Sequence, residues 1–200
     1  MNVDTLEALK KLSYDRVWVT KKVRMESEAR LNRNNYLSMF LINYYTFIVL
    51  ALSIGTLLSE NNNMALFTVI AAVALFGVSL FISYVRFRER ALDYKESYIK
   101  LNELEADIKQ VILKNQEFTE SQLVDKLHSC ELKYSDILAK TENHASIDYQ
   151  KVVVEKGLQS NKKIVIEYYF NVIVKYIIIT LFIITPLILL LPLILNGVFW

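Results

Sequence analysis

The chain has 200 residues, of which 54% are apolar and 22% are charged, and its mean hydropathy is +0.27. Soluble domains average about 45–50% apolar and about 25% charged residues, so this composition excludes a disordered chain and is unusually apolar for a soluble one. The 23 basic and 21 acidic residues give a net charge of +2, which is no footprint for nucleic-acid binding. One cysteine excludes a disulfide framework within the chain and a multi-cysteine metal site. Four glycines and two prolines argue against a β-sandwich or a Gly-rich phosphate loop.

Three long stretches carry no charged residue: 34–59, 61–85 and 176–200. Each exceeds the roughly 20 apolar residues that a helix needs to cross the hydrocarbon core of a bilayer. The alternative is a soluble protein with three buried core helices, but a chain of this size has too little polar surface to cover them. The sequence therefore predicts an all-α membrane protein: a two-helix transmembrane hairpin, a helical cytoplasmic module and a third, C-terminal transmembrane helix.

The predicted segments follow the charge pattern. In chain order they are cytoplasmic N-terminal helices at 1–35, a first span at 36–59, a short outer loop at 60–63, a second span at 64–85, a cytoplasmic helical stalk and module at 86–171, and a third span at 172–198. All basic residues lie before the first span or between the second and third, except Lys175, which lies at the cytoplasmic end of the third span. The positive-inside rule then puts the N-terminus inside and the C-terminus, with Phe199 and Trp200 as interfacial anchors, outside.

The cytoplasmic segments have helical periodicity. We expect a short helix at 5–14, and a second from about residue 19 that continues into the first span. The second span is expected to run on into the stalk, where one heptad seam is formed by Phe87, Ala91, Tyr94, Tyr98, Leu101, Glu105, Ile108 and Ile112. Thr119 and Gln122 predict a capping box for the next helix, whose apolar face is Leu123, Leu127, Cys130, Tyr134 and Ile137. A following short segment should end at Gly157, a typical residue after a helix C-terminus.

The sequence offers little catalytic chemistry. His128 and Cys130 are two residues apart, which places them on nearly opposite faces of a helix, and His144 lies in a polar break. The carboxylates of the stalk alternate with lysines and arginines at the spacing of a solvated helix face. We therefore expect no enzyme, no cofactor, no metal site and no catalytic residue.

Polar residues inside the spans are more informative, because in hydrocarbon they turn toward protein or water. Those of the first span fall within one broad helical face: Asn43, Thr46, Ser53 and Thr56. They line a pore in one interpretation, and in the other they pack helices together through small and hydroxyl side chains. In the third span, Pro186 and Pro192 free backbone carbonyls and are able to kink the helix.

Two further motifs stand on either side of the predicted hairpin. The first covers residues 16–24 and 28–31, with Arg16, Trp18, Lys21, Arg24 and Arg30 as candidate functional residues. The second covers residues 134–138 and 142–149, with Asn143, His144, Asp148 and Tyr149 as candidates for signal binding or for contact between helices. If the second segment is helical, His144 and Asp148 are one turn apart, and the carboxylate orients the imidazole or caps the break. Both a structural turn and a ligand contact remain open.

Both motifs, in this order around a two-span hairpin, resemble the SLATT family of bacterial membrane effectors, in the branch with a third, C-terminal span. The resemblance implies an antiviral-defence effector of the bacterial inner membrane that acts by abortive infection. It implies a pore-forming effector encoded beside a sensor protein, such as a nucleotide second-messenger synthase or a reverse transcriptase. Three spans are too few to enclose a pore, so this hypothesis also requires a homo-oligomer. The alternative hypothesis is a membrane-anchored helical scaffold that recruits a cytoplasmic partner through the heptad seam.

Overall fold

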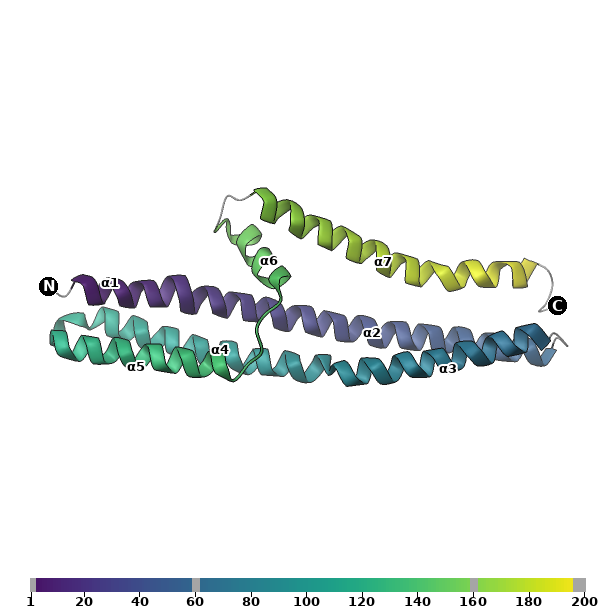
Figure 1. The fold of residues 1–200 in the computed structure, drawn as a ribbon, viewed down its shortest axis with the longest axis horizontal. Helices are drawn as coiled ribbons and strands as arrows, with labels where there is room; N and C mark the ends of the chain where they lie inside the picture. The colour runs from purple at the N-terminus through teal and green to yellow at the C-terminus, as the bar shows by residue number, and fades with distance from the viewer. Residues whose placement is uncertain (1–2, 59–61, 159–161, 196–200) are drawn as a thin grey trace. The chain divides into compact units, whose positions relative to one another are not determined.

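The computed structural model describes the backbone of residues 3–58, 62–158 and 162–195. Its helices are α1 (Val3–Lys11), α2 (Val19–Leu58), α3 (Asn62–Val85), α4 (Phe87–Leu113), α5 (Glu120–Ala139), α6 (Ser146–Lys156) and α7 (Lys162–Leu195) (Figure 1). A π-helical segment, Leu12–Trp18, joins α1 to α2, and a 3₁₀ turn, Asn115–Glu117, follows α4. Within the described ranges there is no strand, which confirms the all-α prediction.

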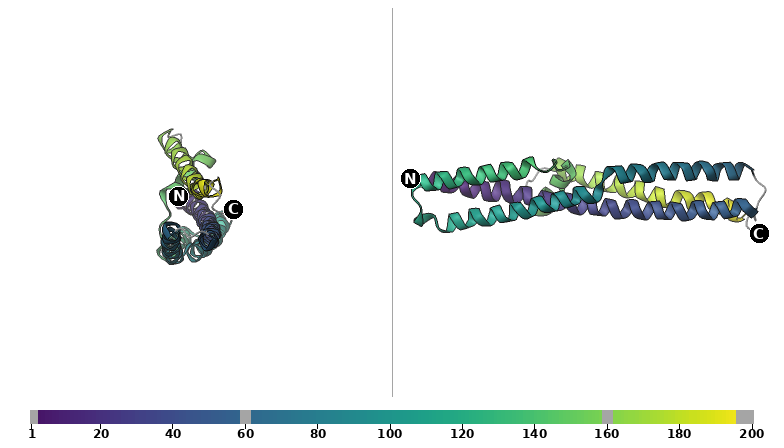
Figure 2. Two further views of the ribbon diagram at one scale, coloured as in Figure 1. Left: turned by 90° about the vertical axis from the view of Figure 1, so that its right-hand side faces the viewer. Right: turned by 90° about the horizontal axis from the view of Figure 1, so that it is seen from below.

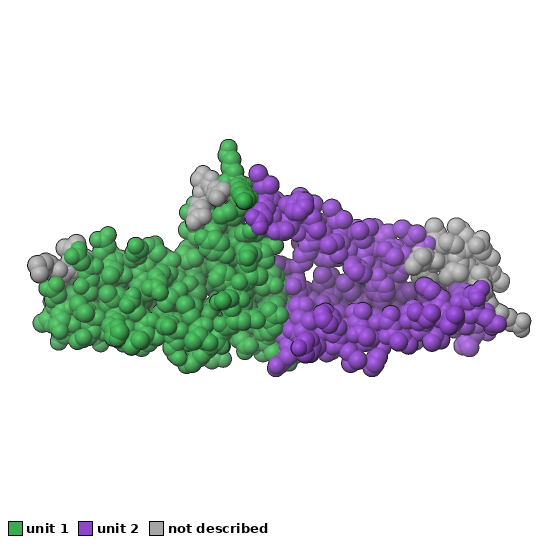
Figure 3. All heavy atoms as spheres, in the orientation of Figure 1, with its two compact units in different colours: residues 1–32, 88–165 green, residues 33–87, 166–200 purple. Residues whose placement is uncertain are grey.

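The chain folds as two compact units (Figure 3). Unit 1 comprises residues 1–32 and 88–165, and unit 2 comprises residues 33–87 and 166–200.

Unit 1 is a helical bundle around one apolar core. Helix α1 and the first part of α2 form one continuous line in the views of Figures 1 and 2, and α4 and α5 run beside it. The core is made by Leu9, Leu12, Val17, Leu101, Leu104, Ile108, Leu123, Cys130, Tyr134 and Ile137. The heptad seam predicted on α4 is buried at Ala91, Tyr94, Leu101, Glu105 and Ile108. The apolar face predicted on α5 is also confirmed, with Leu127 half-buried against the same core.

The predicted starts and stops of the helices in unit 1 are confirmed at two places. At the start of α5 the Thr119 amide donates to Gln122 Oε1 at 2.8 Å, and the Gln122 amide donates to Thr119 Oγ1 at 3.4 Å, so the capping box forms. Gly157 ends α6 with a φ of +62°. This conformation is unfavourable for residues with a Cβ atom, which glycine lacks. The Leu158 amide then donates to the Val153 carbonyl at 3.2 Å and closes the helix end.

Two junctions differ from expectation. The helices predicted at 5–14 and from residue 19 are not separate, because the π-helical segment carries the chain from α1 into α2 without a loop. The second span does not run on unbroken into the stalk: α3 ends at Val85 and α4 begins at Phe87. Arg86, between them, has a φ of +54°, the left-handed region that a non-glycine residue rarely adopts.

Unit 2 contains the residues of α2 from Arg33 onward, α3, and α7 from Ile166 onward. Three helical stretches of the chain are long and apolar enough to cross a membrane, with mean hydropathies of 1.9, 2.6 and 2.1 over their most apolar windows. Only 6% of each window is buried inside the protein. Core helices of a soluble protein would be covered, so these helices fit a membrane protein and not the soluble alternative.

The helices extend beyond the predicted spans, and the limits of the spans stay predictions. Helix α3 already begins at Asn62, inside the predicted outer loop at 60–63, while residues 59–61 lie outside the described ranges. The predicted third span reaches residue 198, whereas the last residue that the structure describes is 195. The predicted anchors Phe199 and Trp200 also lie outside the described ranges.

Candidate functional site

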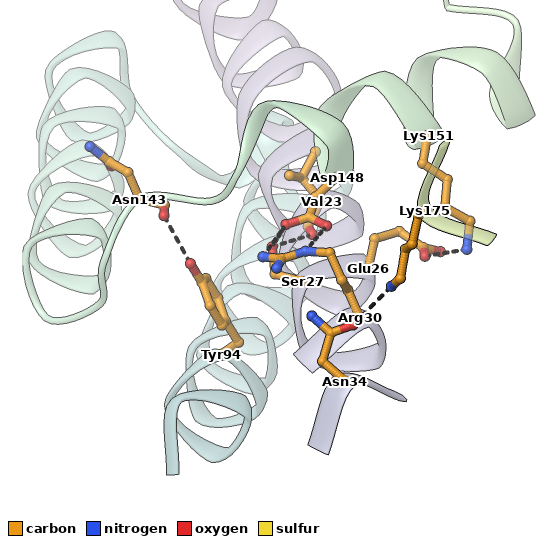
Figure 4. A network of polar contacts seen from close by, with 10 residues as sticks. All are labelled: Val23, Glu26, Ser27, Arg30, Asn34, Tyr94, Asn143, Asp148, Lys151 and Lys175. Atoms are coloured by element: carbon orange, nitrogen blue, oxygen red, sulfur yellow. Dashed lines mark hydrogen bonds and ion pairs between the residues drawn. The ribbon is translucent and has the colours of Figure 1, made fainter. Parts of the chain in front are cut away.

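A buried carboxylate joins the two sequence motifs in unit 1 (Figure 4). Asp148, in the first turn of α6, is 3% exposed. Arg30 of α2 donates two hydrogen bonds to this carboxylate, from Nε to Oδ1 at 2.7 Å and from Nη2 to Oδ2 at 3.0 Å. Ser27, one turn earlier on α2, donates its hydroxyl to Asp148 Oδ2 at 2.7 Å. A fork of this kind fixes both position and orientation, so α6 is held on α2 in one register.

The local sequence of α6 favours a negative charge at this position. Ala145 is the N-cap residue, so Asp148 lies in the first turn, where the free amide groups and the helix dipole stabilise an anion. The Asp148 amide itself donates to the Ala145 carbonyl at 3.0 Å. The carboxylate is thus compensated by a cation, a hydroxyl and a helix terminus, which is what a buried charge requires.

A second ion pair links the same two helices. Lys151 Nζ of α6 lies 2.6 Å from Glu26 Oε2 of α2 (Figure 4), and both side chains are about three-quarters buried, at 26% and 24% exposed. Lys151 also lies 3.6 Å from Glu155, one turn further along α6. Together with the buried Val152 and Val153, these contacts make α6 a firmly attached helix.

Asn143, in the second motif, contacts α4 through its main chain. The Tyr94 hydroxyl donates to the backbone carbonyl of Asn143 at 2.9 Å, so the Asn143 contact does not use its side chain. Tyr94 is 1% exposed, and its burial raises its pKa to about 12. This bond pins the segment between α5 and α6 to α4. Tyr149 is half-buried in the first half of α6.

His144 does not lie on a helix with Asp148, because Ala145 is extended and α6 begins only at Ser146. Its side chain is exposed. Desolvation by the protein around it lowers the pKa of His144, the positive charge of Arg24 lowers it further, and the Asp148 carboxylate opposes both effects. The Asp148 carboxylate therefore acts on the His144 imidazole as a nearby charge, and not as a residue one turn away on the same helix.

The candidate residues of the first motif do not meet in one site. Arg16 stacks on the Tyr134 ring at 4.9 Å and pairs with Glu131 at 3.6 Å. Lys22 lies 6.0 Å from the Trp18 ring, so Trp18 contacts a neighbour on its own helix. Arg16 and Trp18 lie in the π-helical segment and the other three candidates lie on α2, and of the five only Arg30 bonds to Asp148.

Two cations of this motif have buried roles. Arg24 is 3% exposed and donates from Nη1 to the Ile137 carbonyl at 3.3 Å. That carbonyl belongs to the last turn of α5, where a cation complements the helix dipole; desolvation lowers the pKa of Arg24. Lys21 pairs with Glu105, the charged member of the heptad seam. Burial would raise the pKa of Glu105, but hydrogen bonds from Lys109 and Lys21 outweigh it and lower the pKa.

Two polar features of unit 1 were not predicted from the sequence. Thr20 and Tyr134 share a hydroxyl–hydroxyl bond of 2.8 Å between α2 and α5. Gln150 is buried on α6, and its Oε1 has no hydrogen-bond partner in the described part of the chain. Thr20 and Tyr134 lie within the two motifs, but nothing in the sequence pairs them with each other. Gln150 carries no charge and belongs to neither motif.

Cys130 and the histidines form no common site. Cys130 is 5% exposed in the core, and burial raises the pKa of its thiol. His128 is exposed. No group of three or more His, Cys, Asp or Glu side chains able to hold a metal ion occurs among the residues searched, which are the described ones.

In unit 2 the four candidate pore residues differ from one another. The hydroxyls of Thr46, Ser53 and Thr56 donate to carbonyls of their own helix, each at 2.8 Å. Asn43 is exposed, and within the described ranges its amide has no hydrogen-bond partner. Of these four residues, Asn43 is therefore the one whose polar side chain has no hydrogen-bond partner among the described residues.

Helix α7 is attached to α2 within unit 2 at two levels. Lys175 donates to Asn34 Oδ1 at 2.8 Å (Figure 4). Two turns further along α7, the Tyr44 hydroxyl donates to the Ile183 carbonyl at 2.8 Å and the Tyr45 hydroxyl to the Phe182 carbonyl at 2.7 Å.

Comparison with known proteins gives one match. Residues 6–196 match the family model of the SMODS and SLOG-associating 2TM effector domain family 5. The match begins in α1 and runs through α7, so it includes all three apolar helices although the description of the family names two spans. No curated protein and no solved structure matches the chain.

Proposed function

Because the chain belongs to the SMODS and SLOG-associating 2TM effector domain family 5, we propose that it is an antiviral membrane effector that oligomerises and permeabilises the bacterial inner membrane. A sensor protein or its nucleotide signal acts on unit 1, and the helices of unit 2 rearrange in response. The N-terminus is inside and the C-terminus outside, as the distribution of basic residues indicates. The protein acts without catalysis.

One observation carries this proposal: the unpartnered amide of Asn43 on an uncharged, exposed helix. An unsatisfied amide in hydrocarbon costs on the order of a few kcal/mol. Asn43 of a second copy removes this cost, since an amide both donates and accepts hydrogen bonds. A ring of such amides in an oligomer also keeps a path for water through the membrane.

The test is to change Asn43 and measure ion flux through liposomes that contain the full chain. Asn43→Leu should suppress flux without preventing insertion, because it makes the span more apolar. Asn43→Asp should retain flux and favour cations, as rings of carboxylates do. The matched control is Thr46→Val, which removes a hydroxyl bonded to its own helix and should change flux little. Flux through Asn43→Leu equal to that of the wild type would exclude α2 as the lining and make Thr180 and Thr185 of α7 the candidates.

The second candidate function is a membrane-anchored scaffold. The heptad seam through which we expected recruitment is buried in the core of unit 1, so a partner would need another surface. Leu92, Ile99 and Leu113 of α4 are 55%, 44% and 83% exposed and are spaced by multiples of seven residues, which suits contact with a partner helix. A scaffold leaves the membrane potential unchanged when triggered, whereas a pore collapses it, and a potential-sensitive dye distinguishes them.

A further inference from the structure

The hydroxyls of two adjacent tyrosines on α2 bond to two consecutive carbonyls on α7. Tyr45 donates to Phe182 and Tyr44 to Ile183, at 2.7 and 2.8 Å. The tyrosine rings also contact each other edge to face, with centroids 5.6 Å apart. A carbonyl inside a helix normally accepts from the amide four residues later, so a donor from another helix in mid-span needs an explanation.

Pro186 explains why the Phe182 carbonyl is available. In a regular helix the Phe182 carbonyl accepts from the amide of residue 186, but proline has no N–H and its ring crowds that same carbonyl. Tyr45 supplies the missing donor. Pro186 is buried whereas its neighbours Thr185 and Leu187 are exposed, so the proline lies on the side of α7 that the protein covers.

We propose that Tyr44 and Tyr45 form a docking point that holds α7 on α2 in the resting state, and that release of this docking point is the step by which α7 moves when the effector is triggered. Release leaves the Phe182 carbonyl without a donor, which is costly in hydrocarbon and tolerable where water enters. The docking point thus stabilises the closed arrangement in hydrocarbon. Once a water path forms, water bonds to the Phe182 carbonyl and this stabilisation is lost. The docking itself needs no further assumption, whereas its role in triggering rests on the proposed function.

The docking point is tested by a double-mutant cycle on the full chain in liposomes. Spin labels at Asn35→Cys on α2 and Asn171→Cys on α7, with Cys130→Ala, report the distance between the two helices. Tyr45→Phe should raise the ratio of released to docked α7 roughly threefold to tenfold, the range for one hydrogen bond. In the Pro186→Ala background the same change should have no effect, because the backbone amide that alanine restores at this position then satisfies the Phe182 carbonyl. Tyr36→Phe is the matched control, since Tyr36 is 73% exposed on the same helix.

The outcomes separate docking from triggering. An equal effect of Tyr45→Phe in the wild-type and Pro186→Ala backgrounds would overturn the docking point. At the same ratio of protein to lipid, ion flux through these liposomes should be higher for Tyr45→Phe than for wild type. Another outcome is that wild type conducts while Tyr45→Phe changes the distance between the spin labels without changing the ion flux. In that case docking does not control opening, and the proposed role of release in triggering is overturned. If wild type never conducts, the proposed function fails, and the distances alone decide on docking.

Discussion

Replacing Asp148 by asparagine removes the charge on which the attachment of α6 to α2 depends. The carboxylate is 3% exposed and accepts three contacts between 2.7 and 3.0 Å, two from Arg30 and one from Ser27. An amide keeps the shape but offers one acceptor oxygen, so the Arg30 guanidinium loses its counter-charge. Removing one partner of a buried ion pair costs about 3–5 kcal/mol. The Arg30 side chain is 21% exposed and regains some hydration, so we expect the lower end, about 3 kcal/mol.

Urea unfolding of the full chain, followed by Trp18 fluorescence with Trp200 replaced by phenylalanine, measures this loss. Asp136→Asn is the matched control, because Asp136 pairs with Lys140 at 2.6 Å but both side chains are about 60% exposed. An exposed pair contributes at most about 1 kcal/mol. In an Arg30→Met background, Asp148→Asn should cost much less, since no unpaired cation is left. Equal losses for Asp148→Asn and Asp136→Asn would refute the reasoning.

The remaining predictions concern topology, capping, pH and thiol reactivity. A reporter active only outside the inner membrane should work when fused after Trp200 and fail after Gly157; activity at Gly157 would reverse the orientation. Thr119→Ala should lower the free energy of unfolding by about 1 kcal/mol through loss of the cap, measured by the same urea assay. The pKa of Glu105 is lowered in the folded state, so its stabilisation is complete above its ordinary value of 4.5 and is lost as the pH falls through the folded value. The difference in stability between wild type and Glu105→Gln should therefore shrink below pH 4.5. Cys130, buried and with a raised pKa, should react with iodoacetamide only upon unfolding; rapid labelling of the folded chain would contradict its place in the core.

Local signals in the sequence predicted local structure well. The capping box at Thr119, the helix end at Gly157 and the buried face of α5 are confirmed because each depends on residues within a few positions. The uncharged stretches predicted helices long enough to cross a membrane for the same reason. The junction at Arg86 was missed, since an arginine gives no signal for a positive φ.

Long-range pairing was beyond the sequence. Asp148 was singled out, but its partners Arg30 and Ser27 lie 118 and 121 residues away. Spacing along a helix suggested His144 instead, and that suggestion required a helical segment where the chain is extended. Similarly, the sequence indicates that Pro186 frees a carbonyl but not that Tyr45, 137 residues before the acceptor Phe182, supplies the donor. Such partners depend on which helices pack together, which one sequence does not reveal.

The unbroken course of α2 from Val19 to Leu58 makes helical phase a constraint on the length of this segment. Asn34 and Tyr45 both contact α7 and lie on the same helix, with no loop between them to absorb an inserted residue. One extra residue at Leu37 rotates everything beyond it by about 100° and advances it by about 1.5 Å. This change turns Tyr45 away from its acceptor on α7 while Asn34 stays beside Lys175. Seven extra residues add about 10.5 Å but come within about 20° of the original phase. Relatives of this chain should therefore carry insertions here as near-complete pairs of turns, matched by an equal insertion in α7 between Lys175 and Phe182, and should lack single-residue insertions.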